Sequence, residues 1–120
     1  MSKITNTNRS FFENMLKGHN AVESFERLDG DKYQIERKGE RPSLTVLLVS
    51  VYIMSEGEYY EACQDETIDA IVLIGFYNQY TRGAKETSKE NGIALFTPKE
   101  FSGALHRTGK SFINYVPKTK

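Results

Sequence analysis

The sequence predicts an α/β domain, a mixed β-sheet flanked by helices, from two apolar runs and the stretch between them. Residues 71–74 (Ile-Val-Leu-Ile) and 93–96 (Ile-Ala-Leu-Phe) are continuously apolar, as is typical of strands buried on both faces. Thr81 can cap a helix over residues 82–90, and Gly92 supplies a left-handed stop. A strand, a helix and a strand joined so tightly form a right-handed βαβ unit with parallel strands.

The N-terminal third predicts a helix followed by a β-hairpin. Residues 1–8 are polar and are expected to be flexible. Residues 9–18 are predicted to be helical, because apolar side chains recur on one side at helical spacing, at Phe11, Phe12, Met15 and Leu16. Residues 21–38 are predicted to form the hairpin, since the Asp-Gly-Asp run at residues 29–31 is a strong turn signal between two strand patterns.

The rest of the chain completes one domain over residues 9–116. Residues 44–54 are predicted to form a long central strand, followed by a helix through residue 66 that starts at a Ser55/Glu58 capping box. Thr97 and Glu100 form a second capping box, with proline between them, for a last helix over residues 101–107. Residues 111–116 are predicted to be an edge strand, and residues 117–120 to be flexible. The expected order is α-β-β-β-α-β-α-β-α-(β).

Composition limits the classes of function. The 120 residues carry 16 basic and 16 acidic side chains, so no overall attraction to nucleic acid or anionic membranes is expected. The charge is uneven, however, with acidic side chains dominating residues 55–70 and basic side chains dominating residues 80–120. Cys63, the single cysteine, is expected in the core rather than in a zinc site. A polar N-terminus and the lack of a long apolar run predict a cytoplasmic protein without a membrane partner.

The second half of the chain carries a run of spaced residues, namely 70–75 (Ala-Ile-Val-Leu-Ile-Gly), then Tyr80-Thr81, Ala84, Ser88, Gly92-Ile93 and residues 100–105. This run resembles the restriction-endonuclease-like (PD-(D/E)xK) superfamily, particularly its Mrr-like branch. In that branch a buried strand leads to a Thr-capped helix whose small residues pack on the sheet, followed by a glycine, an apolar strand and a short helix. The resemblance covers about residues 68–107 and implies the fold of that superfamily in a bacterial, phage or mobile-element context.

The same resemblance implies that the catalytic residues have been lost. Family members carry Glu-x-Lys or Gln-x-Lys in the central strand and an acid at the second strand. Two carboxylates and a backbone carbonyl hold a divalent metal ion that activates water, and the lysine orients the nucleophile. Here Ser50 stands at the acid position and Tyr52 at the lysine position, and neither hydroxyl replaces its counterpart. One alternative stays open, a Mg²⁺-dependent nuclease with a displaced site in which Glu36 and Lys38 act with Asp31 or Glu26. Otherwise no enzyme activity, metal or cofactor is expected.

Two kinds of binding role are therefore weighed, a protein-interaction role and a nucleic-acid role. The neutral net charge favours the protein-interaction role. A protein-interaction or regulatory role, including homodimerisation, would use an aromatic surface made of Tyr59, Tyr60, Phe76, Tyr77 and Tyr80. A nucleic-acid role would use phosphate contacts from a basic C-terminal face made of Arg82, Lys85, Lys89, Lys99, Arg107 and Lys110.

Overall fold

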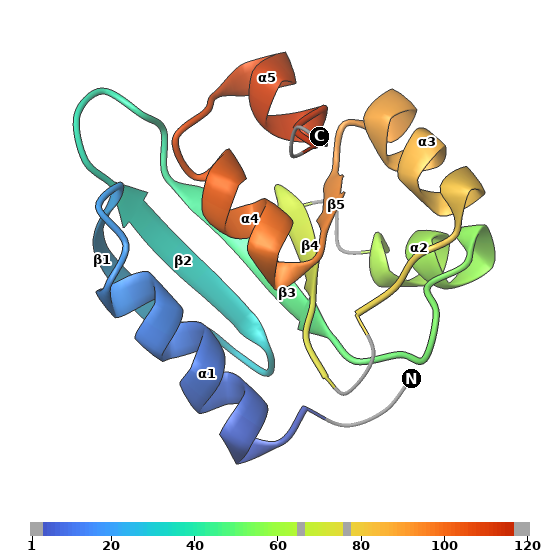
Figure 1. Cartoon of the computed structure of the whole chain (residues 1–120), viewed down its shortest axis with the longest axis horizontal. Helices are drawn as coiled ribbons and strands as arrows, with labels where there is room; N and C mark the ends of the chain where they lie inside the picture. Colours follow the sequence, from blue (N-terminus) through green and yellow to red (C-terminus); the bar gives the residue numbers. More distant parts are fainter. Residues whose placement is uncertain (1–3, 65–66, 76–77, 117–120) are drawn as a thin grey trace.

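The computed structural model describes residues 4–64, 67–75 and 78–116, which fold into an α/β domain with a five-stranded mixed sheet. The elements follow in the order α1 (Asn6–Lys17), β1 (Val22–Arg27), β2 (Lys32–Arg37), β3 (Leu44–Val49), α2 (Glu56–Ala62), β4 (Ala70–Leu73), α3 (Arg82–Asn91), β5 (Ala94–Phe96), α4 (Pro98–Ala104) and α5 (Gly109–Ile113). The predicted α/β class and the sequence of its elements from α1 to α4 are confirmed (Figure 1).

The strands lie in chain order, β1-β2-β3-β4-β5. The pairs β1/β2 and β2/β3 are antiparallel, whereas β3/β4 and β4/β5 are parallel. Strands β1, β3, β4 and β5 therefore end at the same side of the sheet, which we call the carboxyl edge, and the opposite side is the amino edge. Helices α3 and α4 start at the carboxyl edge and run back toward the amino edge, because each follows a parallel strand.

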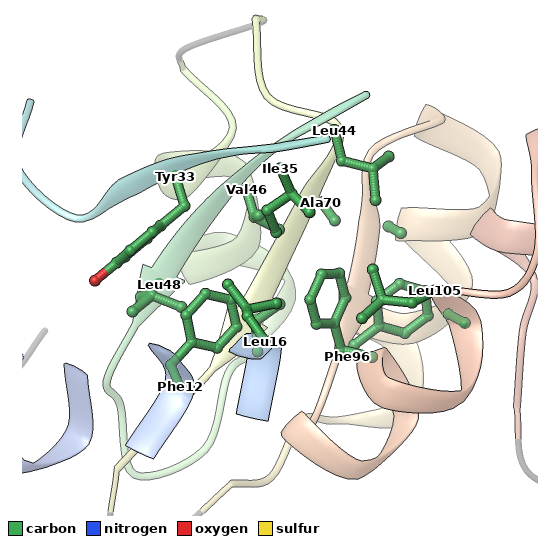
Figure 2. Packing of buried hydrophobic residues seen from close by; sticks show 14 of the residues in the cluster. Phe12, Leu16, Tyr33, Ile35, Leu44, Val46, Leu48, Ala70, Phe96 and Leu105 are labelled. Atoms are coloured by element: carbon green, nitrogen blue, oxygen red, sulfur yellow. The ribbon is translucent and has the colours of Figure 1, made fainter. Parts of the chain in front are cut away.

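Helices cover both faces of the sheet at β3, β4 and β5, which explains the continuous apolar runs. Val72 faces α1, α4 and α5 and belongs to the same core as Phe12, Leu16 and Phe96. Figure 2 labels these three partners in the core. Leu73, the neighbour of Val72, belongs to a second core under α2 and α3. Residues 71–74 are at most 2% exposed, so the prediction of a strand buried on both faces is confirmed.

The predicted helix starts and stops are found at the expected side chains. Thr81 accepts a hydrogen bond from the backbone of Ala84, and both predicted capping boxes are formed. Gly92 ends α3 with a φ of 85°, in the left-handed region that glycine adopts without strain. Cys63 is buried, as expected.

Several predicted boundaries are wrong. Residues 6–8 belong to α1, since Thr5 caps the helix by accepting from the backbone of Asn8. Strand β3 ends at Val49. Beyond it, Val51 and Met54 are buried in the core under α2, whereas Tyr52 and Ile53 are exposed. Helix α2 ends at Ala62, α4 begins at Pro98, and the predicted edge strand over residues 111–116 is replaced by α5. Residues 1–3 and 117–120, expected to be flexible, lie outside the described part of the chain.

Candidate functional site

Of the aromatic residues predicted to bind a partner, the three that the structure describes do not form one exposed surface. Tyr59 is fully buried and donates a hydrogen bond to the carbonyl of Ile93 (2.6 Å). Tyr80 is partly buried and donates to Glu100 Oε2 (2.5 Å), whereas Tyr60 is 57% exposed. The other two residues of the predicted set, Phe76 and Tyr77, lie outside the described residues.

Lys85 is not on a helix exterior, which corrects its prediction as a phosphate contact. The residue is 5% exposed, and its Nζ donates to the carbonyl of Leu95 (2.5 Å) and lies 3.8 Å from Glu100 Oε1. The ammonium also lies 4.7 Å from the ring centre of Phe96 and 5.1 Å from that of Tyr80. Burial lowers the pKa of Lys85 to about 8, against the opposing effect of Glu100. Lys85 therefore satisfies a backbone carbonyl of the edge strand β5.

The other predicted basic residues lie toward opposite edges of the sheet, the carboxyl edge and the amino edge, and do not form one face. Arg82 and Lys99 lie at the first turns of α3 and α4, hence at the carboxyl edge. Lys89 is in the last turn of α3 and lies 3.9 Å from Glu86. Arg107 and Lys110 belong to the α4–α5 connection and to α5, on the side toward which α4 runs.

A denser group of positive charges forms where the β2–β3 loop meets the α4–α5 connection, at the amino edge (Figure 1). Arg41 Nε donates to the carbonyl of His106 (3.3 Å), and its Nη1 donates to the carbonyl of Lys38 (3.0 Å). Within residues 4–64, 67–75 and 78–116, none of the ion pairs involves the charged side chains gathered here. We call this group the basic corner, and it consists of Arg37, Lys38, Arg41, His106, Arg107 and Lys110.

Arg37 holds the two chain segments of the basic corner together. The side chain is 5% exposed and lies with its guanidinium carbon 5.6 Å from the ring centre of Phe112. Its Nε donates to the carbonyl of Pro42 (2.8 Å), and its Nη1 donates to the carbonyls of Leu105 (3.2 Å) and Arg107 (2.6 Å). Burial is the main cause that lowers the pKa of Arg37, and the nearby charge of Arg41 adds to it.

Comparisons with known proteins give no identity for this arrangement. No family model, curated protein or solved structure matches the chain. The case for a function therefore depends on the residues themselves.

At the carboxyl edge, an ion pair lies beside the position where the resemblance implies a metal site. The backbone of Leu48, near the end of β3, donates to the carbonyl of Asp31 (3.0 Å), so Asp31 lies next to that position. Its carboxylate is 2.6 Å from Nη2 of Arg9, a residue of α1. Ser50 is half-buried, and Tyr52 is 66% exposed. The guanidinium of Arg9 thus already neutralises the carboxylate that lies beside this position.

The residues of the alternative displaced site do not come together. Asp31 precedes β2 and Glu36 lies near its other end, a separation of roughly 17 Å at about 3.3 Å per strand residue. Glu26 pairs with Gln34 on the neighbouring strand, and the side chains of Glu36 and Lys38 are exposed. No group of three or more His, Cys, Asp or Glu side chains suited to a metal ion occurs among the described residues. This donor set does not fit one Mg²⁺ ion, which requires converging oxygen ligands.

A groove between α1 and α4 is a third feature, also at the carboxyl edge. The pocket has a volume of about 560 Å³ and is lined on its apolar side by Phe11, Met15 and Pro98, with Asn78 and Lys99 among its polar residues. Phe11 is 56% exposed, whereas the adjacent Phe12 is fully buried.

No helix in the described part of the chain is both long enough and apolar enough to cross a membrane.

Proposed function

We propose that this chain is a non-catalytic, nuclease-like binding module that contacts nucleic acid phosphates through the basic corner. The observation that carries the proposal is that Arg41 and Arg107, on two chain segments joined by the buried Arg37, come together without an ion-pair partner in the described residues. Guanidinium groups suit phosphate oxygens because their donors form a planar fork. The neutral net charge is compatible with this role, since only the local charge has to be positive.

The loss of catalysis is supported by the residues at the carboxyl edge. The element order from α1 to α4 is the one expected from the sequence. Ser50 and Tyr52 stand where the resemblance implies the catalytic acid and lysine, and the Arg9–Asp31 pair lies beside them. Without converging carboxylates, the module would hold nucleic acid without cutting it. Binding is therefore expected to persist when divalent metal ions are removed by a chelator.

The basic corner also offers an aromatic ring for contact with a base. The guanidinium carbon of Arg107 lies 5.2 Å from the ring centre of Tyr115, which is partly exposed. Arginine and aromatic side chains together provide charge for the backbone and a flat surface for stacking, as in proteins that bind single strands. We therefore propose a single-stranded nucleic acid as the ligand, bound without sequence preference.

Charge reversal at the basic corner should abolish this binding. The variant Arg41→Glu/Arg107→Glu/Lys110→Glu is expected to bind a labelled single-stranded oligonucleotide about 100-fold more weakly than the wild type at low salt, because each change turns a phosphate contact into a repulsion. The measurement is a fluorescence anisotropy titration in the presence of chelator, with a thermal melt of each protein to verify folding.

A matched control separates local charge from net charge. The variant Arg27→Glu/Arg82→Glu/Lys99→Glu changes the net charge by the same amount at exposed residues of the carboxyl edge. Two of these positions begin helices, where glutamate is favourable, so the control should fold and should bind within about threefold of the wild type. Equal loss of binding in both variants would show that the basic corner is not the site.

A protein-binding role is the second candidate, favoured by the exposed Phe11 beside the α1–α4 groove. Exposed phenylalanines at a pocket are frequent in interfaces between proteins. If the wild-type protein fails to bind the oligonucleotide but sediments as a dimer that Phe11→Ala converts to a monomer, this second role replaces the first.

A further inference from the structure

Two histidines that are distant in the sequence meet at the border of the basic corner. The ring centres of His19 and His106 are 4.9 Å apart, with 40° between their planes. His19 follows α1, and His106 follows α4, so their contact joins the α1–β1 connection to the α4–α5 connection. His106 is a member of the basic corner, whereas His19 is not.

His19 is fixed by hydrogen bonds at both ring nitrogens. Its Nδ1 accepts from the backbone N–H of Ala21 (3.0 Å), so in this arrangement the ring proton is on Nε2. Nε2 then donates to the carbonyl of Ser102 (2.6 Å), in α4. His19 is therefore a positioning residue that holds its ring against His106.

His106, by contrast, has an exposed side chain surrounded by positive charge. Arg41 contacts its carbonyl, Arg107 is the next residue, and Lys38 and Lys110 belong to the same corner. The β2–β3 loop also carries one carboxylate, that of Glu40, and its side chain is exposed. Partial burial is the main cause that lowers the pKa of His106, followed by the proximity of His19, Arg41 and Arg107.

We propose that a phosphodiester group binds against His106 between Arg41 and Arg107, and that His106 takes up one proton from solvent when it binds. The negative charge of the phosphate would offset the surrounding positive charge that disfavours the imidazolium in the free protein. By thermodynamic linkage, protonation of His106 must strengthen phosphate binding by the same factor by which phosphate binding favours the protonated form of His106. The inference depends on the nucleic-acid role proposed above and adds a specific ligand group and a pH dependence to it.

The direction of the pH effect on affinity follows from comparing the free protein with the complex. The pKa of His106 is higher in the complex than in the free protein, so affinity rises as the pH falls through the interval between the two values. Oligothymidylate is a suitable probe, because a phosphodiester does not itself titrate in this range. At constant ionic strength, wild-type affinity is expected to increase about three- to tenfold from about pH 7.5 to about pH 5.5.

Two variants at one position test whether His106 is the group responsible. His106→Gln should bind within about twofold of the wild type at about pH 7.5 and should lose the pH dependence. His106→Lys should bind at every pH as tightly as the wild type does in acid. In a titration followed by NMR, the pKa of His106 should rise when oligothymidylate is added.

Failure of this inference can be distinguished from failure of the proposed function. Wild-type binding that does not change with pH, or a full pH dependence in His106→Gln, would overturn the histidine assignment and leave the nucleic-acid role intact. Absence of binding at every pH would overturn both. Because His106 is exposed, these variants should melt like the wild type, which a thermal scan verifies.

Discussion

Replacing Glu100 by alanine is expected to lower the free energy of unfolding by about 3–5 kcal/mol, the usual cost of removing one partner of a buried charged pair. The carboxylate of Glu100 has three partners. It accepts from the backbone of Thr97 (3.0 Å) and from the hydroxyl of Tyr80 (2.5 Å), and it lies 3.8 Å from Lys85 Nζ. Its loss would leave a buried ammonium and a partly buried hydroxyl without this acceptor, and would break the capping box of α4.

The control for this prediction is Glu90→Ala, because Glu90 is exposed on the neighbouring helix α3. An exposed substitution of this kind should change stability by less than about 0.5 kcal/mol. Chemical denaturation of the two variants and the wild type gives the comparison. If both variants unfolded at the same denaturant concentration as the wild type, the buried network would have no measurable role in stability.

Arg37→Met is expected to cost about 3 kcal/mol, because hydrogen bonds from a charged donor contribute roughly 1.5–3 kcal/mol and buried acceptors would be left without a donor. Methionine keeps an apolar chain near Phe112, so the change mainly removes the donors to the carbonyls of Pro42, Leu105 and Arg107. The two segments of the basic corner would separate, and oligonucleotide affinity should fall with stability.

Arg41→Met is the matched control for Arg37→Met, since it removes an arginine whose hydrogen bonds are exposed. Its cost should be below about 1 kcal/mol. Equilibrium denaturation in urea measures both values. A larger loss for Arg41→Met than for Arg37→Met would contradict the assignment of Arg37 as the residue that joins the two segments.

Much of the fold could be predicted because its signals are local. The Ser55/Glu58 and Thr97/Glu100 boxes fix two helix starts, and Gly92 fixes a helix end, through residues only a few positions apart. Residues 111–116 were predicted wrongly because a short apolar run is compatible with either a strand or a helix. The tertiary contact decides the outcome, since Phe112 packs edge-on against Phe96 at 5.2 Å.

The candidate site was much less predictable, because its contacts join distant residues. The Arg37–Arg107 and Arg41–His106 hydrogen bonds span 70 and 65 positions, and no local pattern announces them. Lys85 is different, since a local signal existed. It lies three residues before Ser88, which packs on the sheet, so helical geometry places Lys85 at the border of the buried face. Its charge alone suggested an exposed position.

The salt dependence of oligonucleotide binding tests the central claim most directly. For binding through about four phosphates, the logarithm of the wild-type association constant should fall linearly with the logarithm of salt concentration. The expected slope is about −2.8 for a single strand, or roughly −0.7 per phosphate. The charge-reversed variant of the basic corner should bind about 100-fold more weakly than the wild type at the lowest salt concentration. A slope near zero, or no wild-type binding at the lowest salt, would contradict the account.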